Sequence, residues 1–282
     1  MGTEASFGST TEGAQPASTP PVAATALAPA PSFAAAVPFA QESAAFFLHK
    51  VEHRLGEEKV LVQAGPRPEL RSIFVLNDRG NRVPLAATLS LGEDGLPRRL
   101  EMWGQLSTMF ETDLDVIVEG GQARIREGAE SRVMAVPALY FTAVGHAPMG
   151  VKEALIAAWH RHGRHGSIPL VPGGTARLQK RGDDVFELGG KQITLERLDL
   201  AGMTWGREML WIDAQQRLIA AVINEVAGNQ IQVVREGYEP LLAQFDARAG
   251  REAAAILAAQ ASASIREGRH AIVHARLVDG TG

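Results

Sequence analysis

The sequence lacks cysteine entirely, which excludes a disulfide framework and any metal or iron–sulfur site held by thiolates. No apolar run approaches the length of a membrane-spanning helix, so no membrane span is predicted. Cations are not in excess, because 28 lysines and arginines stand against 32 aspartates and glutamates. The resulting net charge of −4 gives no indication of a nucleic-acid partner.

Lysine and arginine are also absent from the first 41 residues, which consist mostly of Ala, Pro, Ser, Thr and Gly. Six prolines interrupt any helix there, and little could form a core. We therefore predict a disordered arm over residues 1–42. The alternative is a processed leader, because residues 34–40 have the small side chains that precede a signal-peptidase cut, although the cationic start and unbroken apolar run of a leader are missing. An extracytoplasmic location, periplasmic or secreted, is a hypothesis on this basis.

The remaining chain has a globular composition, with 45% hydrophobic and 21% charged residues. Over residues 43–237, short apolar runs alternate with turn sequences such as Gly56-Glu-Glu58, Glu119-Gly-Gly121, Arg181-Gly-Asp-Asp184 and Leu188-Gly-Gly190. Strands joined by short turns predict antiparallel pairing and argue against βαβ units. The glycine-rich stretch at residues 171–175 lacks the Lys-Ser/Thr of a phosphate-binding loop, so a hairpin turn is the better interpretation.

Two helices are predicted. Residues 148–162 start at Pro148, carry Val151, Leu155 and Trp159 on one face, and end before Gly163. Residues 238–268 form a long connecting helix, or two helices if Gly250 divides it. The predicted fold is mainly β (α+β): a curved antiparallel meander with one inserted helix, a long C-terminal helix and a disordered N-terminal arm.

Histidines are the first candidates for metal chemistry. His160 and His162 form a His-x-His pair, but it falls at the end of a predicted helix among arginines, where basic side chains favour the negative end of the helix dipole. A surface metal or anion site is the weaker alternative. His49 and His53 share a face in a helix or a strand, yet nothing else gives metal-ligand spacing. We therefore assign no catalytic, cofactor-binding or metal-binding residue in this chain.

Tryptophans are the remaining candidates. Trp103, Trp205 and Trp211 fall in or near predicted strands and could line an apolar pocket under the curved sheet. The alternative is that they belong to the core. The rhythm of residues 204–218 resembles that of lipoprotein-carrier-like modules, in which a curved sheet folds over apolar side chains; this is an analogy of architecture only.

The last twelve residues suggest a family. Residues 271–282 contain four strand formers, Ile272, Val273, Leu277 and Val278, followed by the turn signal Asp279-Gly280. This stretch resembles the opening strand of metal-dependent hydrolases of the amidohydrolase superfamily, in the imidazolonepropionase-like branch. In that family the strand begins a small β-sandwich around a metal-carrying TIM barrel. The resemblance implies that residues 269–282 begin a missing domain and that the catalytic ligands lie beyond Gly282.

Two functions follow. In the first, the chain is the non-catalytic accessory part of an amidohydrolase-like enzyme. That full-length enzyme would act on amide or cyclic amide C–N bonds and use a divalent metal such as zinc. The expected partner of this chain is then the downstream catalytic barrel, with a homo-oligomer as a further option. Whether the chain counts as an enzyme stays open in this interpretation. In the second, it is a stand-alone extracytoplasmic β-sheet module that binds an apolar ligand or a protein partner.

Overall fold

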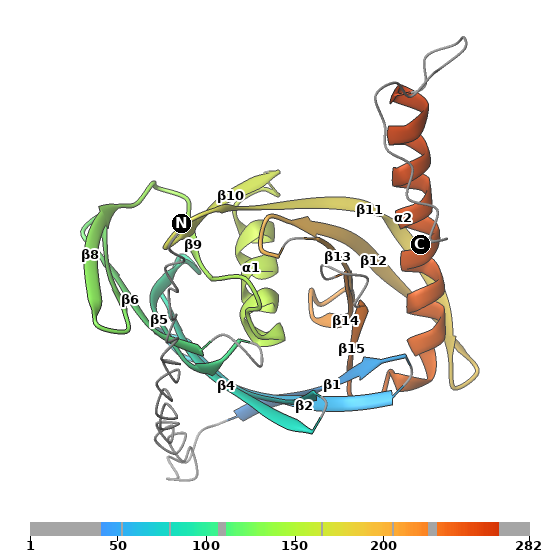
Figure 1. The fold of residues 1–282 in the computed structure, drawn as a ribbon, viewed down its shortest axis with the longest axis horizontal. Helices are drawn as coiled ribbons and strands as arrows, with labels where there is room; N and C mark the ends of the chain where they lie inside the picture. Colours follow the sequence, from blue (N-terminus) through green and yellow to red (C-terminus); the bar gives the residue numbers. More distant parts are fainter. Residues whose placement is uncertain are drawn as a thin grey trace, which may run out of the picture.

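The computed structural model describes residues 41–264, with the exception of residues 52, 79, 107–110, 165, 205 and 225–229. Within these residues the chain forms one sheet of fifteen strands and two α-helices (Figure 1). The first block contains β1 (Gln41–Lys50), β2 (His53–Gln63), β3 (Glu69–Asp78), β4 (Asn81–Leu91), β5 (Pro97–Gln105), β6 (Glu111–Glu119), β7 (Gln122–Glu127) and β8 (Glu130–Ala135). The second contains β9 (Phe141–Thr142), α1 (Met149–Arg161), β10 (Ser167–Val171), β11 (Thr175–Leu188), β12 (Lys191–Ala201), β13 (Arg207–Ile212), β14 (Leu218–Asn224), β15 (Gln230–Arg235), the 3-10 helix η2 (Glu239–Leu241) and α2 (Leu242–Ser264).

Strands β1–β8 form one meander and β10–β15 form a second, and the two meanders meet where β1 pairs antiparallel with β15. Phe46 of β1 lies opposite Arg235 of β15. The strand order runs from β8 through β1 and β15 to β9, and β9 pairs with β10 in parallel while the other described pairs are antiparallel. Among the described residues the sheet is not closed, since β8 and β9 are its edges. The sheet curls around α1, which lies on its inner face (Figure 1).

Burial patterns along the strands show which faces are covered. In β6 the buried residues Leu114, Val116 and Val118 alternate with residues that are exposed or partly exposed, because only the inner face is covered. In β14 all six residues from Leu218 to Ile223 are buried. The run is continuously apolar because the inner core around α1 covers one face of this strand and α2 covers the other.

The fold class predicted from the sequence is confirmed: the chain is mainly β, with one inserted helix and a long C-terminal helix. The first helix begins and ends one residue inside the predicted range. The second begins as η2 and continues as α2, with Gly250 inside one continuous helix. The predicted arm, the end of the predicted connecting helix at residues 265–268 and the predicted first strand of a further domain, residues 269–282, lie outside the described residues.

Two of the predicted turns are wrong, and glycine explains both. Gly56 lies inside β2, where an added Cβ would be 2.3 Å from the carbonyl oxygen of Val75, so the glycine permits close approach of β3; the turn lies instead next to Val51. Gly182 lies inside β11, at a register shift with φ of 146°. Each glycine is needed for a local backbone geometry within a strand, which a sequence pattern does not distinguish from a turn.

Candidate functional site

The N-terminus of α1 is held by a carboxylate from the sheet. Glu58 of β2 is fully buried, and it accepts hydrogen bonds from the backbone N–H groups of Met149 (2.7 Å) and Gly150 (2.9 Å). The hydroxyl of Ser72 donates a third bond (2.8 Å). Pro148 provides no side-chain cap, so Glu58 satisfies N–H groups that lack an intrahelical acceptor and meets the positive end of the helix dipole. Burial raises the pKa of Glu58, and the three hydrogen bonds oppose that shift.

The same end of α1 lies directly against the sheet. Gly150 is buried, and a Cβ added there would be 2.9 Å from Cγ1 of Val60 and 3.2 Å from Cδ2 of Leu70. A side chain at this position would therefore displace α1 from β2 and β3. The glycine lets the helix backbone come close enough for its N–H groups to reach Glu58.

Two ion pairs hold the next residues of α1. Lys152 and Glu208 of β13 form a pair in which each side chain is 1% exposed. The next residue, Glu153, pairs with Arg235 of β15 and accepts a hydrogen bond from the backbone N–H of Leu218 (2.8 Å). Together with Glu58, these contacts attach α1 to strands on both sides of the junction between the two meanders.

The burial of Glu153 gives a pH prediction. Burial raises the pKa of Glu153 above its ordinary value of 4.5, against the opposing effect of Arg235. A folded-state pKa above the unfolded one means that the stabilising contribution is complete below about pH 4.5 and is lost as the pH rises through the raised value. We therefore expect the stability of the wild type relative to Glu153→Gln, measured from about pH 4 to pH 8, to fall as the pH rises above about 4.5. Urea unfolding of both proteins across this range measures it, and a difference that is constant or rises with pH would contradict it.

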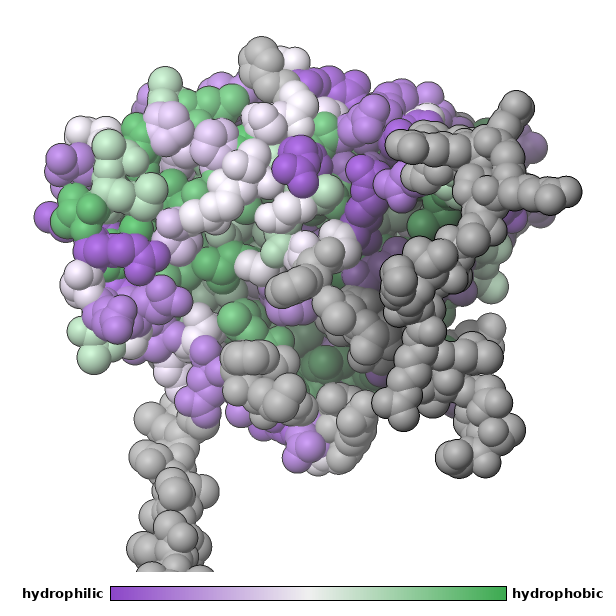
Figure 2. Space-filling model, turned by 45° about the horizontal axis from the view of Figure 1, so that its top comes forward, coloured by the Kyte–Doolittle hydropathy of each residue, from purple (hydrophilic) through white to green (hydrophobic). Residues whose placement is uncertain are grey.

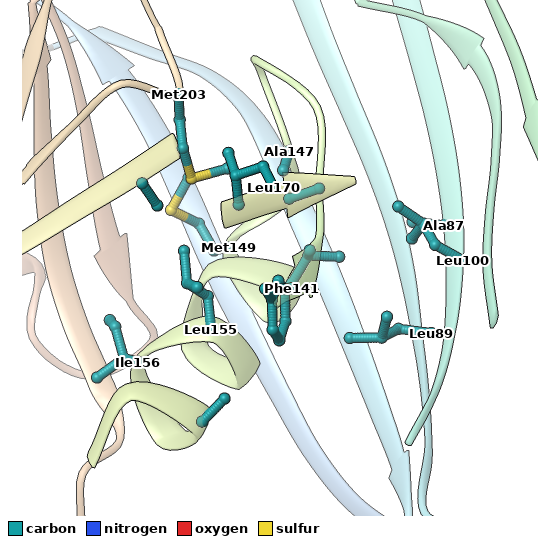
Figure 3. Close-up of a cluster of buried hydrophobic side chains, with 14 of the residues drawn as sticks. Ala87, Leu89, Leu100, Phe141, Ala147, Met149, Leu155, Ile156, Leu170 and Met203 are labelled. Atoms are coloured by element: carbon teal, nitrogen blue, oxygen red, sulfur yellow. The ribbon is translucent and has the colours of Figure 1, made fainter. Parts of the chain in front are cut away.

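The interior of the curved sheet is filled by side chains. Leu155 of α1 lies toward Phe141, with Leu89 and Leu100 of the sheet beyond it, while Ile156 points to the other side of the helix (Figure 3). All five side chains are fully buried. The core that they belong to extends from β1 through β7 and back through β15. In the described part of the chain, α1 thus occupies the space that an apolar ligand would need under the sheet.

The clefts lie at the ends and turns of strands instead. One of about 940 Å³ is lined by charged side chains, among them Arg67, Glu69, Glu93, Asp94 and Arg98. A second, of about 470 Å³, shares Asp94 and Arg98 with it and has an apolar wall that includes Tyr140. Within them Arg98 is already engaged: it donates to Asp94 (2.7 Å) and to the hydroxyl of Tyr140 (3.0 Å). Both clefts are open grooves lined by side chains of both charges, and their polar groups do not converge on one position.

The three tryptophans predicted as a pocket are not brought together where the structure describes them. Trp211 is fully buried on the outer face of β13, 4.9 Å from the ring of Phe245 of α2, and its Nε1 donates to Asp184 (2.9 Å). Trp103 is partly exposed on β5, beside a third cleft of about 450 Å³. Trp205 lies outside the described residues. A ligand pocket formed by these side chains stays a prediction.

The pair His160 and His162 lies at the C-terminal end of a helix, as the sequence predicted. His160 lies in the last turn of α1 and His162 at its C-cap. Burial lowers the pKa of His160, and Arg164 lowers it further. His49 and His53 lie on neighbouring strands next to one turn. Within the described residues, no three His, Asp or Glu side chains converge as a metal site.

The outer face of the sheet carries a second core, under α2. Phe186, Trp211 and Phe245 pack together there, and a polar network borders them. Asp184 accepts hydrogen bonds from Arg197 of β12 (3.1 Å) and Arg248 of α2 (2.7 Å). One turn further along α2, Glu252 pairs with Arg181 and Arg197. These contacts fix the first half of α2 on strands β11–β15.

The second half of α2 extends past the strands (Figure 1). We define the projecting segment as residues 253–261. Seven of its nine side chains are exposed, and Leu257 is 64% exposed. From residue 253 to 264 the sequence holds no charged side chain and seven alanines. Exposed helices are usually polar on the solvent side, so this segment is unusual.

The face of the molecule drawn in Figure 2, by contrast, intersperses hydrophilic and hydrophobic residues. No described helix is long and apolar enough to cross a membrane.

Comparisons with known proteins give likenesses of fold only. No family model and no curated protein matches the sequence. Among solved structures, the chain is similar to a β-barrel-like protein of the domain of unknown function DUF1849 from Brucella abortus, with 14% identity and a TM-score of 0.44, over 71% of this chain and 97% of that one. It is also similar to the hypothetical lipoprotein YmcC from Escherichia coli (K12), with 8% identity and a TM-score of 0.24, over 71% and 84% of the two chains.

The resemblance to the amidohydrolase superfamily is therefore wrong, and with it the hydrolase assignment. Two of the similar solved structures are described as a β-barrel-like protein and a hypothetical lipoprotein. The stretch behind that resemblance, residues 271–282, lies outside the described residues. Its signal consisted of strand formers followed by Asp-Gly, which any strand and turn can show. The described residues form a β-rich module with its own inner and outer cores, which fits the alternative function better.

Proposed function

We propose that this chain is a binding module that holds a protein partner against the projecting segment of α2. The observation that carries the proposal is the exposed, uncharged surface centred on Leu257, in which Gln260 is the one polar side chain among residues 253–261. Burying one leucine side chain contributes about 1.5–3 kcal/mol, and a neighbouring surface of alanines lets another helix approach closely. An extracytoplasmic location remains part of the proposal.

A protein partner is favoured over an apolar small ligand for a structural reason. A ligand under the curved sheet would compete with α1, which is held there by Glu58, by Glu208 through Lys152, and by Arg235 through Glu153. The clefts at the strand ends are open and carry mixed charge. An exposed helical surface is suited to helix–helix docking, one of the common modes of protein recognition.

Site-specific photo-crosslinking in the native host tests the proposal. A photoreactive phenylalanine analogue at Leu257 should give a discrete protein adduct on irradiation. The same analogue at Ala255 is the matched control, because two residues rotate the side chain by about 200° around the helix. Absence of any adduct from position 257, or equal adducts from both positions, would overturn the proposal. The mass of the adduct identifies whether the partner is this chain or another protein.

A further inference from the structure

We infer that the partner of the projecting segment is a second copy of this chain, with the two α2 helices packed antiparallel about a two-fold axis near Leu257. This inference rests on the proposed function and specifies its partner. The first observation is the absence of charge. Arg251 and Glu252 precede the segment, and no charged residue follows until Arg266. A partner that placed charges here would leave them desolvated and unpaired.

The segment itself meets this requirement. A two-fold dimer brings one surface patch against itself, so the patch must be self-complementary. Like charges usually oppose such pairing, and this segment has none. Antiparallel packing also places the positive end of each helix dipole beside the negative end of the other.

The arrangement of side chains supports the same geometry. Leu257 is the middle residue of the segment, with Ala253 and Ala261 one turn away on the same face. An axis near Leu257 would place the two leucines opposite each other and Ala253 of each helix opposite Ala261 of the other, so small side chains on both sides of the leucine contact let the helices approach closely. Because the segment extends past the sheet (Figure 1), the helices can meet there without contact between the two sheets.

The size of the contact sets its strength. Nine helical residues span about 13 Å, which is short for an interface, and stable complexes bury about 1,200–2,000 Å² in total. The contact therefore belongs to the weak, reversible class. We expect dimer dissociation constants of roughly 10–100 μM.

Analytical ultracentrifugation of the purified chain from about 1 to 300 μM, a span chosen to bracket that constant, tests the inference. Wild type and Ala255→Glu should shift from monomer to dimer with concentration, whereas Leu257→Glu should stay monomeric, with at least a tenfold weaker association. Circular dichroism and thermal unfolding of each variant separate a lost contact from a lost fold. Concentration-independent monomers for the wild type, or equal loss in both variants, would overturn the second copy as partner.

The absence of cysteine provides a second measurement that needs no loss of function. Leu257→Cys should form a disulfide-linked dimer under mild oxidation, since the two-fold axis brings the two residues together. Ala255→Cys should crosslink at least five times more slowly. Equal rates would overturn the antiparallel geometry.

The experiments together separate the two proposals. If the wild type is monomeric while the photoreactive residue at position 257 captures a different protein in cells, the second copy fails as partner and the proposed function stands. If neither experiment gives a contact, both proposals fail.

Discussion

Replacing Lys152 with methionine should lower the free energy of unfolding by about 3–5 kcal/mol, because Glu208 would be left as a buried charge without its cation. Both side chains are 1% exposed, and Oε1 of Glu208 already has no hydrogen-bond partner among the described residues. Methionine retains most of the volume of lysine, so little of the loss would come from a cavity. Urea or guanidinium unfolding at pH 7 measures the change.

The matched control is Lys59→Met on β2, where the lysine side chain is 68% exposed. It should change the stability by less than about 0.5 kcal/mol. The double variant Lys152→Met/Glu208→Leu removes both charges and should recover most of the loss, because an apolar pair of similar size can replace a buried ion pair at little cost. A single variant within about 1 kcal/mol of the wild type would show that the interior accommodates an unpaired carboxylate.

These buried charges show where sequence reasoning stops. Lys152 follows Val151 on a helix whose apolar face was predicted correctly, and it shares a face with Leu155, Ile156 and Trp159 at three- and four-residue spacing. That spacing was a sign of a buried lysine. Its partner, however, lies 56 residues away in a strand that is buried on both faces, and only the folded chain brings the two together.

The fold class was more accessible, because repeated short strands with tight turns specify antiparallel neighbours locally. The pairing of β1 with β15, which joins the two meanders, involves residues nearly 190 positions apart, such as Phe46 and Arg235, and no local signal marks it. The tryptophans show a similar limit. Trp211 lies in a strand covered on both sides, so its apolar surroundings do not indicate which face it occupies.

The projecting segment shows a different limit. The seven alanines between residues 253 and 264 are visible in the sequence and are compatible with close packing of the helix on a sheet or on another helix. The structure uses the first half of α2 for the sheet, through Phe245 and Ala249, and leaves Leu257 exposed. Where the covered part of a helix ends depends on the width of the sheet beneath it, which strand patterns alone do not give.

The final prediction concerns Glu58, the carboxylate that holds the start of α1. Glu58→Ala should destabilise the fold by about 2–4 kcal/mol, because the N–H groups of Met149 and Gly150 and the hydroxyl of Ser72 would lose their acceptor in a buried environment. Glu58→Gln keeps one acceptor oxygen but turns an amide N–H toward these donors, so we expect about half that loss. Chemical unfolding at pH 7 gives both values.

A purely global loss would not prove the role of Glu58, so a local measurement is needed. Hydrogen exchange should accelerate at the amides of Met149 and Gly150 by at least tenfold in Glu58→Ala, and by much less at the C-terminal end of α1. Glu57→Ala is the matched control, since its side chain is 44% exposed and pairs only with surface cations. If Glu58→Ala proves as stable as the wild type, the stabilising free energy of the three hydrogen bonds only offsets the cost of burying the carboxylate. In that case α1 is held mainly by its apolar face and by the contacts of Lys152 and Glu153.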